Sequence, residues 1–254
     1  MENEKKEIKK RKHNKLAAIS NCVSLGIIIT IGATLLVSKK ITDKRFENVN
    51  KDLFRKTIFN VPAVLPVKNG KVNLNIRDCF SQDEVDEIVE AIEDLDIEAE
   101  GIDFDVSFED KDIKKSINIK SYDYIKNDDI RMETLGYTDF FVNNYTAKIV
   151  YPINLYINTE DIEFYGADFN TVVRHELLHC FGFADLYADK YEDNIMYYGE
   201  SGYYKPLAEE ELEALNTVYS PKRTGLVQVE KPTNIIYKRD NENLELEELE
   251  TESK

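Results

Sequence analysis

Three residues that could form a metal site stand close together in the stretch VVRHELLHCFGFAD. His175 and His179 are four residues apart, and Glu176 directly follows the first histidine. On an α-helix, residues four apart lie on the same face, so the two imidazoles can hold one metal ion. Glu176 lies about 100° further round the helix, where it can reach a water molecule on that metal without binding the metal itself. The spacing predicts a metal site with a general base beside it.

Composition and burial favour this interpretation over a chance pairing. The chain holds only three histidines, and two of them belong to this stretch. Most of its other side chains are apolar, which predicts a buried helix. Polar groups on a buried helix are costly unless a partner satisfies them, and zinc is the simplest partner for two histidines. A purely structural histidine pair is the alternative.

An open catalytic zinc site needs a third protein ligand. The remaining histidine, His13, lies far away near the N-terminus. Gly182 can adopt the left-handed conformation that ends a helix and turns the chain back. That turn would bring Asp185 toward the two histidines, so Asp185 is the predicted third ligand. A surface aspartate that merely follows the helix is the alternative reading, and the fallback ligands are Asp189, Glu192 and Asp193.

The upstream sequence predicts the elements that position this helix. Residues 72–76 alternate apolar and polar side chains, as a half-buried strand does. Ser81 and Glu84 have the spacing of a capping box and predict a helix over residues 82–94. Further strands are expected over residues 102–108, around Ile117 and Ile119, and over residues 146–158, where Pro152 would divide one strand or separate two.

The remaining parts of this region are assigned more simply. Residues 122–144 are interpreted as a tyrosine-rich loop, and either Asp168 or Asn170 is expected to cap the histidine helix. Cys180 directly follows the second histidine but lies about 140° round the helix from His175, so we expect a small buried residue. A disulfide between Cys79 and Cys180 is permitted but not required.

The N-terminal region has the pattern of a membrane anchor. Residues 16–38 are uncharged and mainly apolar, long enough to span a hydrocarbon core of about 30 Å. More basic residues precede this stretch than follow it, which predicts a cytoplasmic N-terminus and an extracytoplasmic body. A cleaved signal peptide, which would give a secreted protein, is the alternative, and a buried globular helix is a weaker one. The net charge of −16 makes nucleic acid an unlikely partner.

Beyond the histidines, the order H-E-x-x-H-x-x-G-x-x-D followed by I-M-x-Y resembles the metzincin clan of zinc endopeptidases, and most of all its matrixin branch. The resemblance implies that Met196 forms a turn beneath the metal and that Tyr198 supports the metal site or the transition state. Core packing is the alternative role for both. Asp185 stands where matrixins have a histidine, which resembles the snapalysin-like branch. No pro-segment with a zinc-blocking cysteine is recognisable.

The resemblance implies an α+β fold: a metzincin-like catalytic domain with a twisted mixed sheet, an active-site helix and a C-terminal helix near residues 207–220. The apolar stretch at residues 16–38 predicts one transmembrane helix before this domain. The expected organisation is a basic cytoplasmic segment 1–15, a transmembrane anchor 16–38, a linker 39–69, a zinc metalloprotease domain 70–222 and an acidic disordered tail 223–254.

The function expected is a membrane-anchored zinc endopeptidase that cuts protein or peptide substrates, with Zn²⁺ as cofactor and Glu176 as general base. Two alternatives remain open. One is a surface binding module that keeps zinc without catalysis. The other is a gluzincin-type peptidase whose third ligand is a glutamate of the later helix, Glu209 or Glu210.

Overall fold

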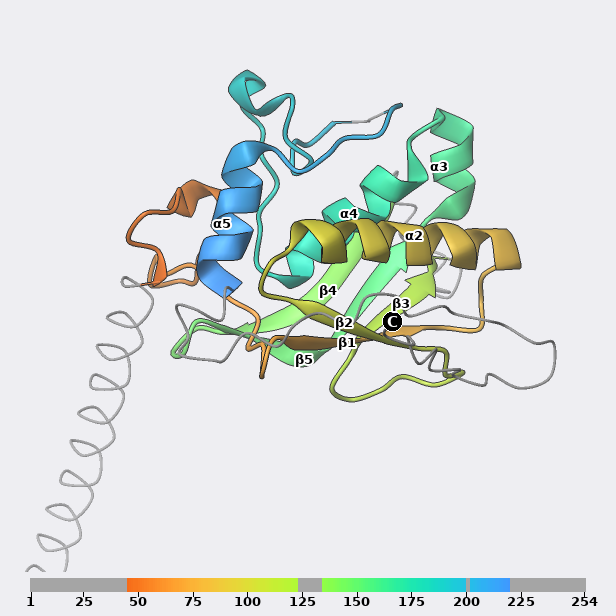
Figure 1. Ribbon diagram of the computed structural model, residues 1–254, viewed down its shortest axis with the longest axis horizontal. Helices are drawn as coiled ribbons and strands as arrows, with labels where there is room; N and C mark the ends of the chain where they lie inside the picture. The colour runs from red at the N-terminus through yellow and green to blue at the C-terminus, as the bar shows by residue number, and fades with distance from the viewer. Residues whose placement is uncertain (1–44, 123–133, 200–201, 220–254) are drawn as a thin grey trace, which may run out of the picture.

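The computed structural model describes residues 45–122, 134–199 and 202–219 (Figure 1). Five strands form one mixed sheet: β1 (Lys71–Ile76), β2 (Asp103–Ser107), β3 (Ile117–Ser121), β4 (Gly136–Asn143) and β5 (Lys148–Ile157). The helices are α2 (Gln82–Glu98), α3 (Thr159–Tyr165), α4 (Phe169–Cys180) and α5 (Glu209–Tyr219), with single 3-10 turns at Lys51–Leu53 and Asp189–Tyr191. The predicted α+β class is confirmed.

The sheet has the strand order β2-β1-β3-β5-β4. The first four strands in this order are mutually parallel, whereas β4 runs antiparallel to β5 and closes one edge. Parallel neighbours need a crossover, and α2 provides the one between β1 and β2. The antiparallel pair needs only the short turn at residues 144–147. Helix α4, which carries the histidines, packs on β4 at this edge and on its neighbour β5.

Helices α2 and α4 lie side by side on the same face of the sheet (Figure 1). The predicted capping box begins α2: Ser81 Oγ accepts from the Glu84 backbone N–H at 3.3 Å, and Glu84 Oε2 accepts from the Ser81 N–H at 2.6 Å. The helix continues past the predicted end at residue 94 to Glu98. Its buried stripe of Val85, Ile88, Ala91, Ile92 and Leu95 faces the core.

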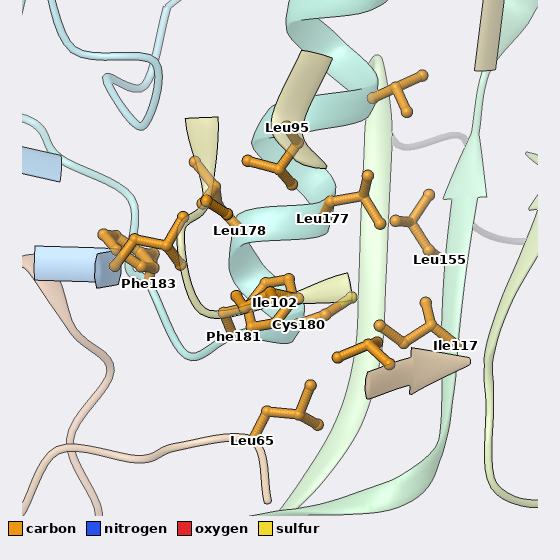
Figure 2. Close-up of a cluster of buried hydrophobic side chains, with 14 of the residues drawn as sticks. Leu65, Leu95, Ile102, Ile117, Leu155, Leu177, Leu178, Cys180, Phe181 and Phe183 are labelled. Carbon is orange, nitrogen blue, oxygen red and sulfur yellow. The ribbon is translucent and has the colours of Figure 1, made fainter. Parts of the chain in front are cut away.

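Helix α4 is fixed in the core by its apolar side chains. Leu177, Leu178 and Phe181 are fully buried, and Figure 2 shows them among residues of the sheet and of α2. Burying one such side chain contributes about 1.5–3 kcal/mol. Cys180 is buried as expected, and both it and Cys79 are free thiols. Because the apolar side holds α4 firmly, its polar side can present the histidines at a fixed angle.

The prediction of a loop over residues 122–144 is wrong for β4. An edge strand of the kind seen here has partly exposed side chains on both faces, so it shows no clean alternation of apolar and polar residues. The single strand β5 also continues through Pro152. Pairing with β3 begins only at Ile153, and the register with β4 shifts between Asp139 and Phe141, so the missing N–H of Pro152 falls where the ladder is irregular.

The predicted linker is folded from residue 45 onward. Phe46, Leu53, Phe54 and Leu65 are buried in the same core as the sheet. The folded unit therefore begins before residue 70. These apolar residues are spaced without strand or helix periodicity, which is why their burial does not show in the sequence.

Residues 53–55 of this folded segment hold the turn that follows α4. Arg55 N–H donates to the Gly182 carbonyl at 2.8 Å, and Ala184 N–H donates to the Leu53 carbonyl at 2.9 Å. Between these two bonds, the rings of Phe54 and Phe183 pack with centroids 4.5 Å apart. The turn carrying Asp185 is thus built from two parts of the chain that are distant in sequence.

The N-terminal segment 1–15, the predicted membrane segment 16–38 and the acidic tail 223–254 lie outside the described residues. Across the part of the chain that the structure describes, no helix is both long enough and apolar enough to cross a membrane.

Candidate metal centre

The histidine helix begins at a defined cap. Asp168, one of the two predicted capping residues, accepts from the Thr171 N–H at 2.8 Å. The other candidate, Asn170, donates instead to Asp94 of α2 at 2.8 Å. Asp168 thus begins α4 and Asn170 joins it to α2. Together they fix the position of the helix that carries the histidines.

His175 and His179 face the same side of α4, with ring centroids 4.7 Å apart and ring planes nearly perpendicular. Each Nδ1 lies beside a backbone carbonyl: Ile195 O at 2.8 Å from His175, and Phe183 O at 3.0 Å from His179. A carbonyl only accepts hydrogen bonds, so each Nδ1 carries the proton. The Nε2 lone pairs are left for a metal, and metal-binding histidines commonly donate their other ring N–H to a carbonyl in this way.

The structure brings Asp185 to both histidines. Its Oδ1 lies 3.3 Å from His175 Nε2 and 3.2 Å from His179 Nε2. Atoms that bind one zinc ion tetrahedrally at about 2.0–2.1 Å stand about 3.3 Å apart. Two imidazole nitrogens and one carboxylate oxygen at this spacing therefore fit a zinc ion.

The approach of Asp185 depends on Gly182. This glycine has a φ of 99°, and a Cβ at its position would lie 2.2 Å from the Ala63 carbonyl oxygen. The left-handed turn expected from the sequence is therefore present. The close approach of the Ala63 carbonyl leaves no room for a side chain at residue 182, which is a second reason for glycine that the sequence does not reveal.

Charges in the cluster favour a cation. Burial opposes ionisation of Asp185, but hydrogen bonds with His175 and His179 outweigh it and hold the pKa of the carboxyl well below its ordinary value. Burial likewise opposes protonation of His175, but the Asp185 hydrogen bond and the nearby Glu176 charge outweigh it and raise the pKa of the imidazole. Positive charge shared between these groups is stabilised, whether it arrives as a proton or as a metal ion.

Glu176 is placed beside the two histidines and held by the edge strand. Its carboxylate is within 4.8 Å of the ligand atoms of both histidines, further than Asp185 is from either. The side chain is 5% exposed, and its Oε2 accepts from Thr138 Oγ1 at 2.6 Å. A Cβ on Gly136 would lie only 2.6 Å from Glu176 Cγ, so β4 approaches this glutamate as closely as a strand can. Both β4 contacts were missed because the sequence predicted a loop there.

Met196 lies in a buried turn that is held from α5. The fully buried carboxylate of Glu211 accepts from Ile195 N–H at 3.1 Å, Met196 N–H at 3.0 Å and Ala208 N–H at 2.9 Å. Burial raises the pKa of Glu211, although these backbone donors oppose the shift. The carbonyl of Ile195 in the same turn is the one that faces His175. Glu211 therefore positions the carbonyl that faces His175, one of the predicted metal ligands.

Of the two glutamates predicted as alternative ligands, Glu210 is hydrogen-bonded elsewhere and Glu209 is exposed. Glu210 accepts from Asn194 Nδ2 at 3.1 Å and from Asn50 Nδ2 at 3.5 Å. Glu209 begins α5. The fallback residues Asp189, Glu192 and Asp193 are exposed on the loop beyond the site. Of the predicted third ligands, Asp185 is the one that the fold brings to the histidines.

Replacing Glu211 with alanine is expected to lower the free energy of unfolding by roughly 3 kcal/mol or more, because three buried backbone N–H groups lose their acceptor at about 1–3 kcal/mol each. Chemical denaturation of the wild type and the variant measures this difference. Glu213→Ala, at an exposed position of the same helix, is the matched control and should change stability by less than about 0.5 kcal/mol. Equal losses in both variants would show that Glu211 does not support the turn.

Tyr198 lines a cleft beside the candidate metal centre. Its side chain is 66% exposed and packs on the ring of Tyr187 with centroids 5.1 Å apart. The cleft has a volume of about 480 Å³ and reaches His175 and Glu176. Its walls come from the start of β4, from α3 and α4, and from the chain on either side of residues 200–201.

The chemistry that this centre could perform is inferred from its geometry, since neither a comparison with models of known protein families nor one with curated proteins finds a match to this chain.

Proposed function

We propose that this chain is a zinc-dependent endopeptidase. The observation that carries the proposal is the position of Asp185 Oδ1, 3.2–3.3 Å from the Nε2 atoms of two histidines whose Nδ1 atoms are engaged by carbonyls. Three protein ligands leave a fourth position for water, as a catalytic zinc site requires. Glu176 lies next to that position and could act as a general base, which a hydrolytic site needs and a site that only binds zinc does not.

In this proposal His175, His179 and Asp185 hold Zn²⁺. When bound, the metal lowers the pKa of a water molecule and polarises the scissile carbonyl. Glu176 takes a proton from the attacking water and delivers it to the leaving amine nitrogen. Thr138 Oγ1 donates to Glu176 Oε2 and so holds the carboxylate in one orientation. Tyr198, which is exposed and lines the cleft, is proposed to donate to the oxygen that gains negative charge.

A peptide substrate suits the surroundings of the centre. The strand β4 is the last of the sheet and begins in the wall of the cleft. An edge strand offers backbone groups that an extended peptide can pair with. The acidic net charge of −16 argues against nucleic acid as the substrate. The apolar stretch at residues 16–38 supports our further proposal that the domain acts outside the membrane, either anchored or secreted after cleavage.

A zinc-keeping binding module is the main competing function. Structural zinc sites are normally closed by four protein ligands. In the part of the chain that the structure describes, Glu176 is the remaining acidic group near both histidines, and Thr138 already engages its carboxylate. A glutamate of α5 as third ligand has less support, since Glu210 is bound to Asn194 and Asn50.

The test uses the full chain, purified in detergent and offered a broad library of peptides. We expect one zinc ion per chain and cleavage at internal peptide bonds. Activity should disappear when a chelator removes the metal and return when zinc is added back. Protein that holds zinc but cuts no peptide in the library would overturn the peptidase proposal in favour of the binding module.

A further inference from the structure

A buried lysine lines the same cleft as the proposed catalytic residues. Lys205 is only 6% exposed, and it forms part of the cleft wall with His175 and Glu176. Its Nζ donates to the Glu192 carbonyl at 2.8 Å and lies 5.7–5.8 Å from the ring centres of Tyr203 and Tyr197. The side chain is thus held in place, and its position is not that of a lysine extended into solvent.

The charge of Lys205 is not neutralised by a neighbouring acid. Within residues 45–122, 134–199 and 202–219, no carboxylate lies within 4.0 Å of its Nζ. A carbonyl and two aromatic rings stabilise an ammonium only in part. By contrast, the neighbouring buried cation, Arg174, pairs with Glu98 at 3.3 Å. A buried ammonium with hydrogen-bonding capacity to spare favours an anionic ligand.

The rest of the cleft fits the stem of a side chain. Leu135 and Val172 give it apolar surface, and Thr171 lies next to Lys205, whose backbone N–H donates to Thr171 Oγ1 at 2.9 Å. The volume of about 480 Å³ exceeds what one amino-acid side chain needs. A side chain with an apolar stem and an acidic end matches both features, and glutamate and aspartate are the two that have them.

We propose that Lys205 makes this cleft the acceptor of an acidic side chain, so that the preferred substrates carry glutamate or aspartate beside the bond that is cut. The inference rests on the proposed peptidase function, because it names the substrate class of that same site. The chain as a whole is acidic and repels polyanions at long range. The substrates that fit are therefore neutral or basic peptides with one acidic residue at the cleavage site.

The decisive experiment compares matched peptides that differ only in glutamate or glutamine beside the scissile bond. We expect kcat/KM for the glutamate peptide to be higher by about tenfold or more, as buried charge pairs across interfaces give. In Lys205→Met the two peptides should be cut equally well, whereas Lys205→Arg should keep the preference. Lys190→Met, which removes an exposed lysine outside the cleft, is the control and should behave as the wild type. A wild type without preference, or a preference that survives Lys205→Met, would overturn the inference.

A binding measurement separates this inference from the proposed activity. Fluorescence anisotropy with labelled peptides is carried out on Glu176→Ala, with and without Lys205→Met. Tighter binding of the glutamate peptide that disappears in the double variant supports the role of Lys205 even if no peptide is ever cut. Equal binding of both peptides to Glu176→Ala counts against it, even if the protein is a peptidase. Zinc content and circular dichroism of each variant verify folding, and Lys205→Arg provides the comparison if Lys205→Met does not fold.

Discussion

Replacing Glu176 with glutamine is expected to lower kcat by about 10²–10⁴-fold, the contribution of a positioned general base, and to leave zinc binding unchanged. Glutamine has nearly the same shape as glutamate, and its amide oxygen can still accept from Thr138 Oγ1, so packing against β4 is preserved. What is lost is the ability to take the proton of the attacking water. Steady-state kinetics on a cleaved library peptide, together with the zinc content of both proteins, measure the effect.

The matched control is Glu163→Gln, at an exposed position of α3 outside the cleft wall. It removes the same charge and should leave kcat within about twofold, as surface substitutions do. If Glu176→Gln instead loses its zinc together with its activity, Glu176 is a ligand and not the base. That outcome would point to a closed structural site, because three ligands plus Glu176 would complete it.

Replacing Asp185 with alanine should weaken zinc binding by more than the 10–100-fold that loss of an outer-shell partner typically costs, roughly 100-fold or more. Among the described residues, this carboxylate is the one anionic group within 3.3 Å of both histidine Nε2 atoms. Without it, two neutral imidazoles remain as ligands. Competition titration with a coloured zinc chelator measures the dissociation constants of the wild type and the variant.

Two further variants test whether Asp185 or another acidic residue is the third zinc ligand. Asp189→Ala removes an exposed acid from the same loop, and Glu210→Ala removes the glutamate offered as an alternative ligand. Both should bind zinc as the wild type does. Loss of zinc in Glu210→Ala with retention in Asp185→Ala would contradict the assignment and favour a third ligand from α5.

The parts of the site that the sequence predicts are those that local geometry decides. The spacing of His175, Glu176 and His179 is fixed by the helical repeat, and Gly182 predicts the turn that brings Asp185 back toward the histidines. The capping box at Ser81 is likewise a matter of three neighbouring residues. Each of these predictions involves groups close together in the chain, so tertiary packing has little opportunity to alter them.

The parts that escaped prediction depend on long-range pairing. Thr138 and Gly136 reach Glu176 only because β4 pairs with β5 at the sheet edge, and a partly exposed edge strand leaves no periodic signal. Glu211 stands in a run with Glu209 and Glu210, and no local pattern tells which carboxylate turns inward. Only the packing of α5 against the Ile195 and Met196 turn singles it out.

The two backbone hydrogen bonds that join residues 53 and 55 to the turn at residues 182–184 have a mechanical meaning. They join residues 53–55 and residues 182–184 as a short antiparallel pair, with Phe54 opposite Phe183. A displacement of residues 53–55 would therefore act on the Asp185 turn through these bonds and the Phe54–Phe183 contact. Of the three proposed zinc ligands, Asp185 is the one whose turn is joined to this segment.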